Sequence, residues 1–338
     1  MSDPLLTIGI PHLDRTEHLR TAIGSCLQQT IPVKIIVADQ GGSDDTAKLM
    51  ARYADHPHVE HLDTSGSAHC LWDNWRQVAE ACATPYFAWL QDDDRISQIY
   101  AMRVVKAFEL CPKALHWQAR CYVSIDNERA AWWGPNGPHV GLKMMDSGAE
   151  QWPGQLLLGS MYLLSWALSP GVAFRCGDVF SEALRNLPTG CDLFQERLVL
   201  ASMGLCGPFV ADSVTAGYWH HHGKNESYAQ NGQPGEIDRQ LAVMIDYMDG
   251  LLDQAGDWLE LFYMWLRTRS PQEILGWMEK FPCKASRHYD AMMVAMSESV
   301  KDRVRPVDPQ PGRDTALEAG DSTLVFDPSE IDSMRLAS

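Results

Sequence analysis

The first hundred residues predict an α/β fold with a doubly wound sheet. Short apolar runs recur along this segment, and their apolar residues are continuous rather than alternating, which is typical of strands covered on both faces. Segments with helical spacing separate the runs. This repeated strand–helix order implies mainly parallel strands joined by right-handed crossovers.

Four strands are expected in this part of the chain, at Leu5–Ile10, Val33–Ala38, Val59–Leu62 and Tyr86–Leu90. The helix after the first strand places Leu19, Ile23 and Leu27 four residues apart, and the helix after the second begins at the capping residue Ser43. Ligands bind beyond the carboxyl ends of the strands in such sheets. The polar residues that follow each apolar run are therefore the candidates for a functional site.

The second half of the chain has a less regular pattern. A helix is expected within Ser97–Cys111, and at least one strand within Ala114–Ile125. Residues 127–153 are rich in Trp, Gly and Pro and show no clean period, so we interpret them as loops. Amphipathic helices are expected from about Glu236 to Met296, and residues 304–338 have the composition of a flexible tail.

Composition and charge exclude several classes of protein. The formal net charge is -16, from 44 acidic and 28 basic residues, which disfavours binding to nucleic acid or to an anionic membrane. The nine cysteines form no Cys-x-x-Cys pair, which favours a reducing compartment. The N-terminus resembles no signal peptide, and the longest apolar run, Leu156–Leu168, is too short to span a bilayer. We expect a cytoplasmic protein without a transmembrane segment.

Three consecutive carboxylates, Asp92, Asp93 and Asp94, directly follow the fourth strand. Adjacent carboxylates repel one another, and a bound divalent cation such as Mn²⁺ or Mg²⁺ removes the cost of desolvating them. The same ion holds substrate phosphates. A solvated acidic turn before the next helix is the alternative interpretation of this run.

A further carboxylate, Asp39, ends the second strand and lies at the same predicted edge of the sheet. It is placed to accept a hydrogen bond from a nucleotide base or a ribose hydroxyl. An ordinary strand-to-helix turn, with Gly41 and Gly42 supplying the tight backbone, accounts equally well for this segment.

Four segments in this order resemble the nucleotide-binding half of a family 2 glycosyltransferase. Ile10–Arg15 resembles the family's first-strand segment, of the Pro-Thr-Tyr-Asn-Arg type, and Val37–Thr46 resembles its Val-Val-Asp-Asp-Gly-Ser segment. Trp72–Trp75 resembles the family's Asn-containing helix start, and Trp89–Asp94 resembles its Asp-rich run. The resemblance covers about residues 5–110 and implies the GT-A fold, a Rossmann-like sheet flanked by helices, here with an added C-terminal helical region.

The resemblance also implies roles for individual residues. The donor nucleotide sugar would be bound by residues that match the family's segments: Pro11, His12, Asp14, Asp39, Asn74, Asp92 and Asp93. Asp39 would contact the base, Asp92 and Asp94 would hold the metal ion, and Asp93 is a candidate for the ribose. The chain departs from the family at His12, Leu13 and Gln40, so the identity of the nucleotide stays open.

Two segments further along the chain complete the resemblance. The segment Gly190–Arg197 resembles the family's acidic helix start, which makes Asp192 the candidate general base and Glu196 its nearest substitute. A helix N-cap is the other interpretation of Asp192. The segment His220–Ser227 resembles the family's His-x-x-Asn-x-Ser end, with His222 as the expected ligand of the metal or diphosphate.

We therefore expect an inverting, metal-dependent glycosyltransferase that moves a sugar from a nucleotide-diphosphate sugar, in particular a UDP-sugar, to the hydroxyl of a glycan or other acceptor. Residues 1–230 would form the catalytic domain, with a nucleotide-binding half (1–115) and an acceptor half (116–230). Residues 236–300 would form the C-terminal helical region, which offers a surface for a homodimer. A nucleotidyltransferase acting on a sugar phosphate and a non-catalytic sugar-nucleotide-binding protein are the alternatives.

Overall fold

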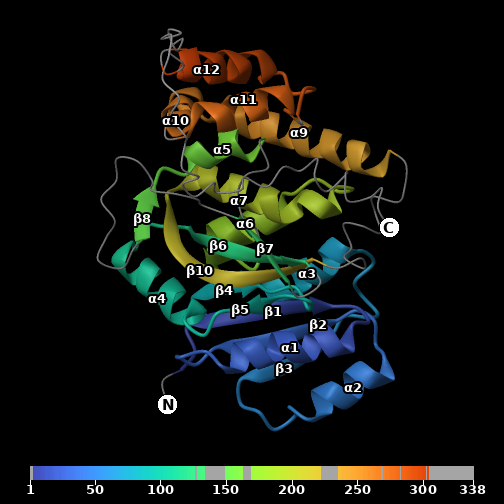
Figure 1. Ribbon diagram of the computed structural model, residues 1–338. Helices are drawn as coiled ribbons and strands as arrows, with labels where there is room; N and C mark the ends of the chain where they lie inside the picture. Colours follow the sequence, from blue (N-terminus) through green and yellow to red (C-terminus); the bar gives the residue numbers. More distant parts are fainter. Residues whose placement is uncertain are drawn as a thin grey trace, which may run out of the picture.

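The computed structural model describes residues 3–125, 128–133, 149–162, 169–221, 235–267, 269–281, 283–301 and 303. A mixed sheet of ten strands crosses the protein in the order β3-β2-β1-β4-β9-β6-β10-β5, with β7 beside β6 and β8 beside β10. In Figure 1 the sheet occupies the lower and middle part of the molecule, and helices α5, α7 and α9–α12 are stacked above it.

The N-terminal half confirms the four predicted strands, at β1 (Leu6–His12), β2 (Lys34–Asp39), β3 (Val59–Asp63) and β4 (Tyr86–Trp89). All four are parallel to their neighbours within this group. They are connected by α1 (Thr16–Leu27), α2 (Asp44–Ala51) and α3 (Leu71–Glu80). The register pairs His12 with Asp39, so the carboxyl ends of β1 and β2 lie side by side.

The second half extends this sheet with both parallel and antiparallel strands. Its elements are β5 (Arg95–Ile96), α4 (Tyr100–Leu110), β6 (His116–Ile125), β7 (Glu128–Trp133), β8 (Ala149–Trp152), α5 (Gln155–Met161), β9 (Val172–Arg175), α6 (Asp178–Arg185), the 3-10 helix η1 (Asp192–Phe194), α7 (Gln195–Cys206) and β10 (Phe209–His221). Strand β9 runs antiparallel between β4 and β6 and joins the two halves into one sheet.

The prediction that residues 127–153 are loops is wrong at both ends of that segment. Strand β7 pairs with β6, and β8 pairs with β10, which is far away in the sequence. The partner strands supply the hydrogen bonds that define these elements, so their own composition gives little sign of them. Residues 134–148 lie outside the described part of the chain.

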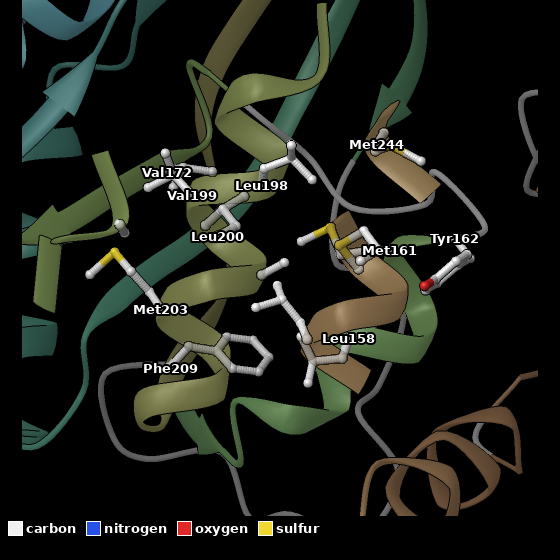
Figure 2. Close-up of a cluster of buried hydrophobic side chains, with 14 of the residues drawn as sticks. Leu158, Met161, Tyr162, Val172, Leu198, Val199, Leu200, Met203, Phe209 and Met244 are labelled. Carbon is white, nitrogen blue, oxygen red and sulfur yellow. The ribbon is translucent and has the colours of Figure 1, made fainter. Parts of the chain in front are cut away.

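The C-terminal helices are α9 (Glu236–Gln254), α10 (Trp258–Leu266), α11 (Pro271–Glu279) and α12 (Tyr289–Lys301). One cluster of buried apolar side chains extends from Ile36 in β2 to Val300 in α12. Figure 2 shows its centre, where Leu158 and Met161 of α5 lie near Leu198 of α7 and Met244 of α9. The C-terminal helices therefore share a hydrophobic core with the sheet.

A second cluster of buried side chains includes residues of β1, α1 and α4, so the sheet is covered on both faces as its continuous apolar strands predicted. Among the residues that the structure describes, no helix has the length and apolarity needed to cross a bilayer.

Candidate active site

A cleft of about 1110 Å³ opens beyond the carboxyl ends of β1 and β4. Seven of the predicted site residues line it, namely Pro11, His12, Asp14, Asn74, Asp92, Asp93 and Asp192. The cleft thus brings residues from the two halves of the chain together. Asp39 and Asp94 are not among the residues that line the cleft, and His222 lies outside the described residues.

The carboxylates of the acidic run are buried, with exposed fractions of 1%, 5% and 1% for Asp92, Asp93 and Asp94. Arg15, in the turn between β1 and α1, lies against two of them. Its guanidinium donates to Asp92 Oδ1 at 2.5 Å and to Asp93 Oδ2 at 2.6 Å. Burial works to lower the pKa of Arg15, but these two carboxylates raise it above its ordinary value.

His12 fixes the other oxygen of Asp92. Its Nδ1 lies 2.7 Å from Asp92 Oδ2, and its Nε2 lies 2.9 Å from the Thr46 hydroxyl at the start of α2. The imidazole is buried, so this chain of contacts holds Asp92 rigidly between β1 and α2. The histidine that replaces the family's threonine is therefore a positioning residue for the acidic run.

Asp94 is held by β10, a strand from the second half of the chain. Its Oδ1 accepts a hydrogen bond of 2.8 Å from the backbone N–H of His220 in β10, while its buried Oδ2 has no hydrogen-bond partner among the residues that the structure describes. Burial, and then the neighbouring Asp93, raise the pKa of Asp94 well above its usual range. Both effects disfavour the ionised form of Asp94, which a nearby cation would stabilise.

The negative charge of the acidic run therefore favours the binding of a cation. Of the three buried carboxylates, Asp92 and Asp93 contact the Arg15 guanidinium, and Oδ2 of Asp94, which has no partner in the described part of the chain, is a potential ligand. Among the described residues, no three His, Cys, Asp or Glu side chains are already grouped as metal ligands. For a divalent ion, Asp92 and Asp94 are the candidate ligands, and Mg²⁺ commonly takes further oxygens from a bound diphosphate.

Asp39 is held by its own turn. Its Oδ1 accepts from the backbone N–H groups of Gly41 at 3.1 Å and Gly42 at 3.0 Å, and its Oδ2 lies 3.3 Å from His61 Nε2. Gly42 has a φ of 59°, a conformation that favours glycine. The next side chain, Gln40, lines the cleft.

Asn74, near the start of α3, ties three strand ends together. Its Nδ2 donates to the carbonyls of His12 and Ala38, at 3.2 Å and 3.1 Å, and its Oδ1 accepts from the Thr64 hydroxyl at 2.8 Å. Because its amide is engaged with β1, β2 and the residue after β3, Asn74 sets the shape of the cleft floor.

Two further carboxylates that line the cleft come from the second half of the chain, Asp192 in η1 and Glu196 in α7. Asp192 is half-buried, and burial raises its pKa. Glu196 is 7% exposed, and burial raises its pKa to about 8. The backbone N–H of Ser169 donates to Glu196 at 2.7 Å, and the Ser169 hydroxyl donates to the carbonyl of Trp89 at the end of β4, so Glu196 is tied to the strand that carries the acidic run.

Sequence reasoning gave no site role to Arg15, Gln40 or Ser169. Arg15 had a signal, because an arginine ends the family segment that it resembles. Ser169 had none, since its place depends on contacts with Trp89 and Glu196, which are far from it in the sequence. Of the three consecutive histidines, the structure places His220 at the acidic run through its backbone, with its ring 5.6 Å from the ring of His18.

The comparisons with known proteins agree with this geometry. The sequence model described as "Glycosyl transferase family 2" matches residues 7–151. No curated protein matches the chain. Two solved structures of S. aureus TarS residues 1-349 are similar in fold at 13% identity. The complex with UDP-GlcNAc has a TM-score of 0.52 and covers 88% of this chain and 82% of TarS 1-349. The complex with UDP has a TM-score of 0.50 and covers 88% and 81%.

The match of residues 7–151 contains β1 through β8, and with them the acidic run and the residues that position it. The resemblance and the GT-A fold expected from four short segments are thereby confirmed. The chain is a glycosyltransferase with a family 2 segment at residues 7–151.

Proposed function

We propose that this protein transfers a sugar from a nucleotide-diphosphate sugar to an acceptor hydroxyl with inversion at the anomeric carbon, and that it needs Mn²⁺ or Mg²⁺. The observation that supports this most directly is the cleft itself. Its lining combines the buried carboxylates Asp92 and Asp93, from the nucleotide-binding half of the chain, with Asp192 and Glu196 from the second half. An inverting transfer needs such a division between a diphosphate site and a base.

The donor nucleotide sugar would lie along the acidic run. Asp92 and Asp94 would hold the divalent ion, which offsets the charge that develops on the leaving diphosphate. Asp93 and Arg15 are beside it, and Arg15 offers a cation for a phosphate oxygen. A UDP-sugar is the proposed donor because TarS, which shares the fold, has been solved with UDP and with UDP-GlcNAc.

The base in this proposal is Asp192, with Glu196 as its substitute. It accepts the proton of the acceptor hydroxyl while that oxygen bonds to the anomeric carbon and the bond from this carbon to the diphosphate breaks. Asp39 stays a predicted contact of the nucleotide base, with Gln40 beside it in the lining of the cleft. His222 stays a predicted ligand, and the acceptor is a glycan or another hydroxyl compound.

The test combines the purified chain with Mn²⁺ and a panel of nucleotide sugars and measures released nucleoside diphosphate with and without oligosaccharide acceptors. We expect slow donor hydrolysis of one nucleotide sugar, abolished by EDTA and by Asp92→Asn or Asp94→Asn. Asp178→Asn, an exposed carboxylate of α6 away from the cleft, is the matched control and should retain full activity.

Other results point elsewhere. Release of pyrophosphate from a nucleoside triphosphate and a sugar phosphate would identify a nucleotidyltransferase. Tight binding of a nucleotide sugar without turnover in any mixture would indicate a binding protein. Once an acceptor is found, Asp192→Asn should lower the transfer rate by about 10²–10⁴-fold while donor binding persists. If Glu196→Gln shows that loss and Asp192→Asn does not, Glu196 is the base.

A further inference from the structure

Two cysteines meet at the end of the sheet opposite the cleft. Cys82 follows α3 in the turn that leads into β4, and Cys176 follows the last residue of β9. Their sulfur atoms are 3.5 Å apart, although 94 positions separate them in the sequence. Strand β4 runs from this pair toward the acidic run, so neither thiol belongs to the glycosyl-transfer site.

The sheet itself imposes this approach. Tyr86 pairs with Arg175 in the antiparallel register of β4 and β9, and the backbone N–H of Cys176 donates to the carbonyl of Pro85 at 2.9 Å. Both cysteines are therefore carried by backbone segments that are hydrogen-bonded to each other. A disulfide needs the sulfurs to close to about 2.05 Å, which from this distance requires a small movement of side chains and turn.

The two thiols differ in acidity. The hydrogen bond from Cys176, which is the largest cause, together with contacts from the Thr84 hydroxyl and backbone, lowers the pKa of Cys82 to about 6. The same hydrogen bond, followed by burial, raises the pKa of Cys176. Cys82 is thus the more acidic thiol of the pair, and the thiolate is the reactive form of cysteine.

Two further observations support a reactive pair, namely its position near the surface and the different pKa shifts of the other cysteine thiols. Cys82 and Cys176 are half-buried, and Ala81, Ala83 and Gly177 beside them are exposed, so the pair lies close to the surface of the protein. Burial raises the pKa of each of the other seven cysteine thiols, including that of the exposed Cys206.

We propose that Cys82 and Cys176 form a redox-active dithiol, which a low-molecular-weight disulfide such as oxidised glutathione converts to an intramolecular disulfide. The Cys82 thiolate attacks one sulfur of oxidised glutathione, forming a mixed disulfide and releasing one glutathione thiolate. Cys176 then loses its proton and attacks the Cys82 sulfur, and the second glutathione leaves. The protein gives up two electrons and two protons, and oxidised glutathione becomes two molecules of the reduced thiol.

The test uses the full chain in glutathione redox buffers at pH 7, with free thiols blocked by N-ethylmaleimide before digestion. Trypsin leaves each cysteine of the pair in a peptide with no other cysteine, Gln77–Arg95 and Cys176–Arg185. We expect these two peptides to be joined, the intact protein to lose two hydrogen atoms, and the melting temperature to rise by several degrees because the cross-link restricts the unfolded chain.

Serine variants separate the two thiols. In Cys176→Ser the reaction should stop at a stable glutathione adduct on Cys82, while Cys206→Ser, the matched control, should still form the joined peptides. In the unmodified chain, N-ethylmaleimide should label Cys82 several-fold faster than Cys206 at pH 7. The proposal is overturned if the joined peptides do not form at any glutathione ratio, or if Cys82 and Cys206 are labelled at equal rates.

Discussion

At the scale of single residues, burial sets Glu196 apart from Asp192, the other carboxylate that the second half of the chain contributes to the cleft. Its pKa of about 8, raised by burial and only partly offset by the Ser169 N–H and the charge of Arg197, means that it is protonated at neutral pH in the folded chain. In the unfolded chain its pKa is close to 4.5. The folded form therefore binds one more proton than the unfolded form between these two values.

This difference predicts how stability depends on pH. Glu196 contributes stability that is fully present below about pH 4.5 and is lost as pH rises through about 8. Urea unfolding of the unmodified chain and of Glu196→Gln, compared at pH 5 and pH 9, should show the variant gaining relative stability at pH 9, by at most about 4 kcal/mol. Parallel pH profiles for the two proteins would mean that Glu196 is ionised in the folded state.

Arg15 supports a second prediction about single residues. It is the cation that contacts both Asp92 and Asp93, and its side chain is 26% exposed. Arg15→Ala leaves these carboxylates without their counter-ion, so we expect the free energy of unfolding to fall by about 1–3 kcal/mol. Arg20→Ala breaks only a surface pair with Glu17 on α1 and should cost less than about 0.5 kcal/mol.

Mn²⁺ provides an internal check, measured by thermal unfolding without any substrate. If the loss in Arg15→Ala is electrostatic, Mn²⁺ should restore part of it and raise the melting temperature of this variant more than that of Arg20→Ala. An equal response of the two variants would mean that Arg15 acts through packing rather than charge.

The residue scale also shows which parts of the site could be predicted from sequence. Asp92 follows an apolar strand and Asp192 lies at a predicted helix start, so both could be located from the sequence, and both line the cleft. The contact between His12 and Asp92 could not be predicted, because it joins residues 80 positions apart whose approach depends on the pairing of β1 with β4.

At the scale of elements, local patterns predicted the four strands of the N-terminal half, but in the second half they indicated a strand only within Ala114–Ile125, where β6 lies. β1, β2 and β4 are continuous apolar runs covered on both faces, and their pattern is sufficient to identify them. β9 has four residues and becomes a strand because β4 and β6 lie on either side of it. Such long-range pairing leaves no period in the sequence.

The packing of α5 against α10 gives the prediction for this scale. A Cβ added to Gly159 in α5 would lie 2.8 Å from Cγ of Phe262, which is fully buried in α10. Gly159→Ala should therefore lower the free energy of unfolding by about 1–3 kcal/mol through overpacking. Gly24→Ala in α1 is the matched helical control, because nothing lies within 4 Å of its added Cβ, and it should stabilise by about 0.5–1 kcal/mol.

Chemical denaturation of both glycine variants measures the difference. If Gly159→Ala is as well tolerated as Gly24→Ala, then α5 and α10 are not closely packed, and the docking of the C-terminal helices on the rest of the chain is loose.

At the scale of the whole molecule, the C-terminal helices lie at the end of the protein farthest from β3 and α2 (Figure 1), yet their apolar faces point into the shared core. Met244, Phe262 and Met296 are each fully buried there. Some apolar side chains of these helices remain exposed, Met264 at 56% and Leu275 at 47% among them. The homodimer through this region stays a prediction, which sedimentation of the intact chain can test.

The shared core makes truncation the most direct test of how the chain is organised. Each buried Leu, Met or Phe contributes about 1.5–3 kcal/mol, so removing α9–α12 costs more than the 5–15 kcal/mol that usually stabilises a domain. A chain that ends at Gly235 should therefore lack a cooperative thermal transition.

A chain that ends at Val304, which removes only the segment expected to be a flexible tail, should melt within about 2 °C of the full protein, because fully surface-exposed segments contribute little to stability. Circular dichroism on the three chains decides the matter: a cooperative transition for residues 1–235 would show that the sheet folds without its C-terminal helices, and a large loss in residues 1–304 would show that the tail packs on the core.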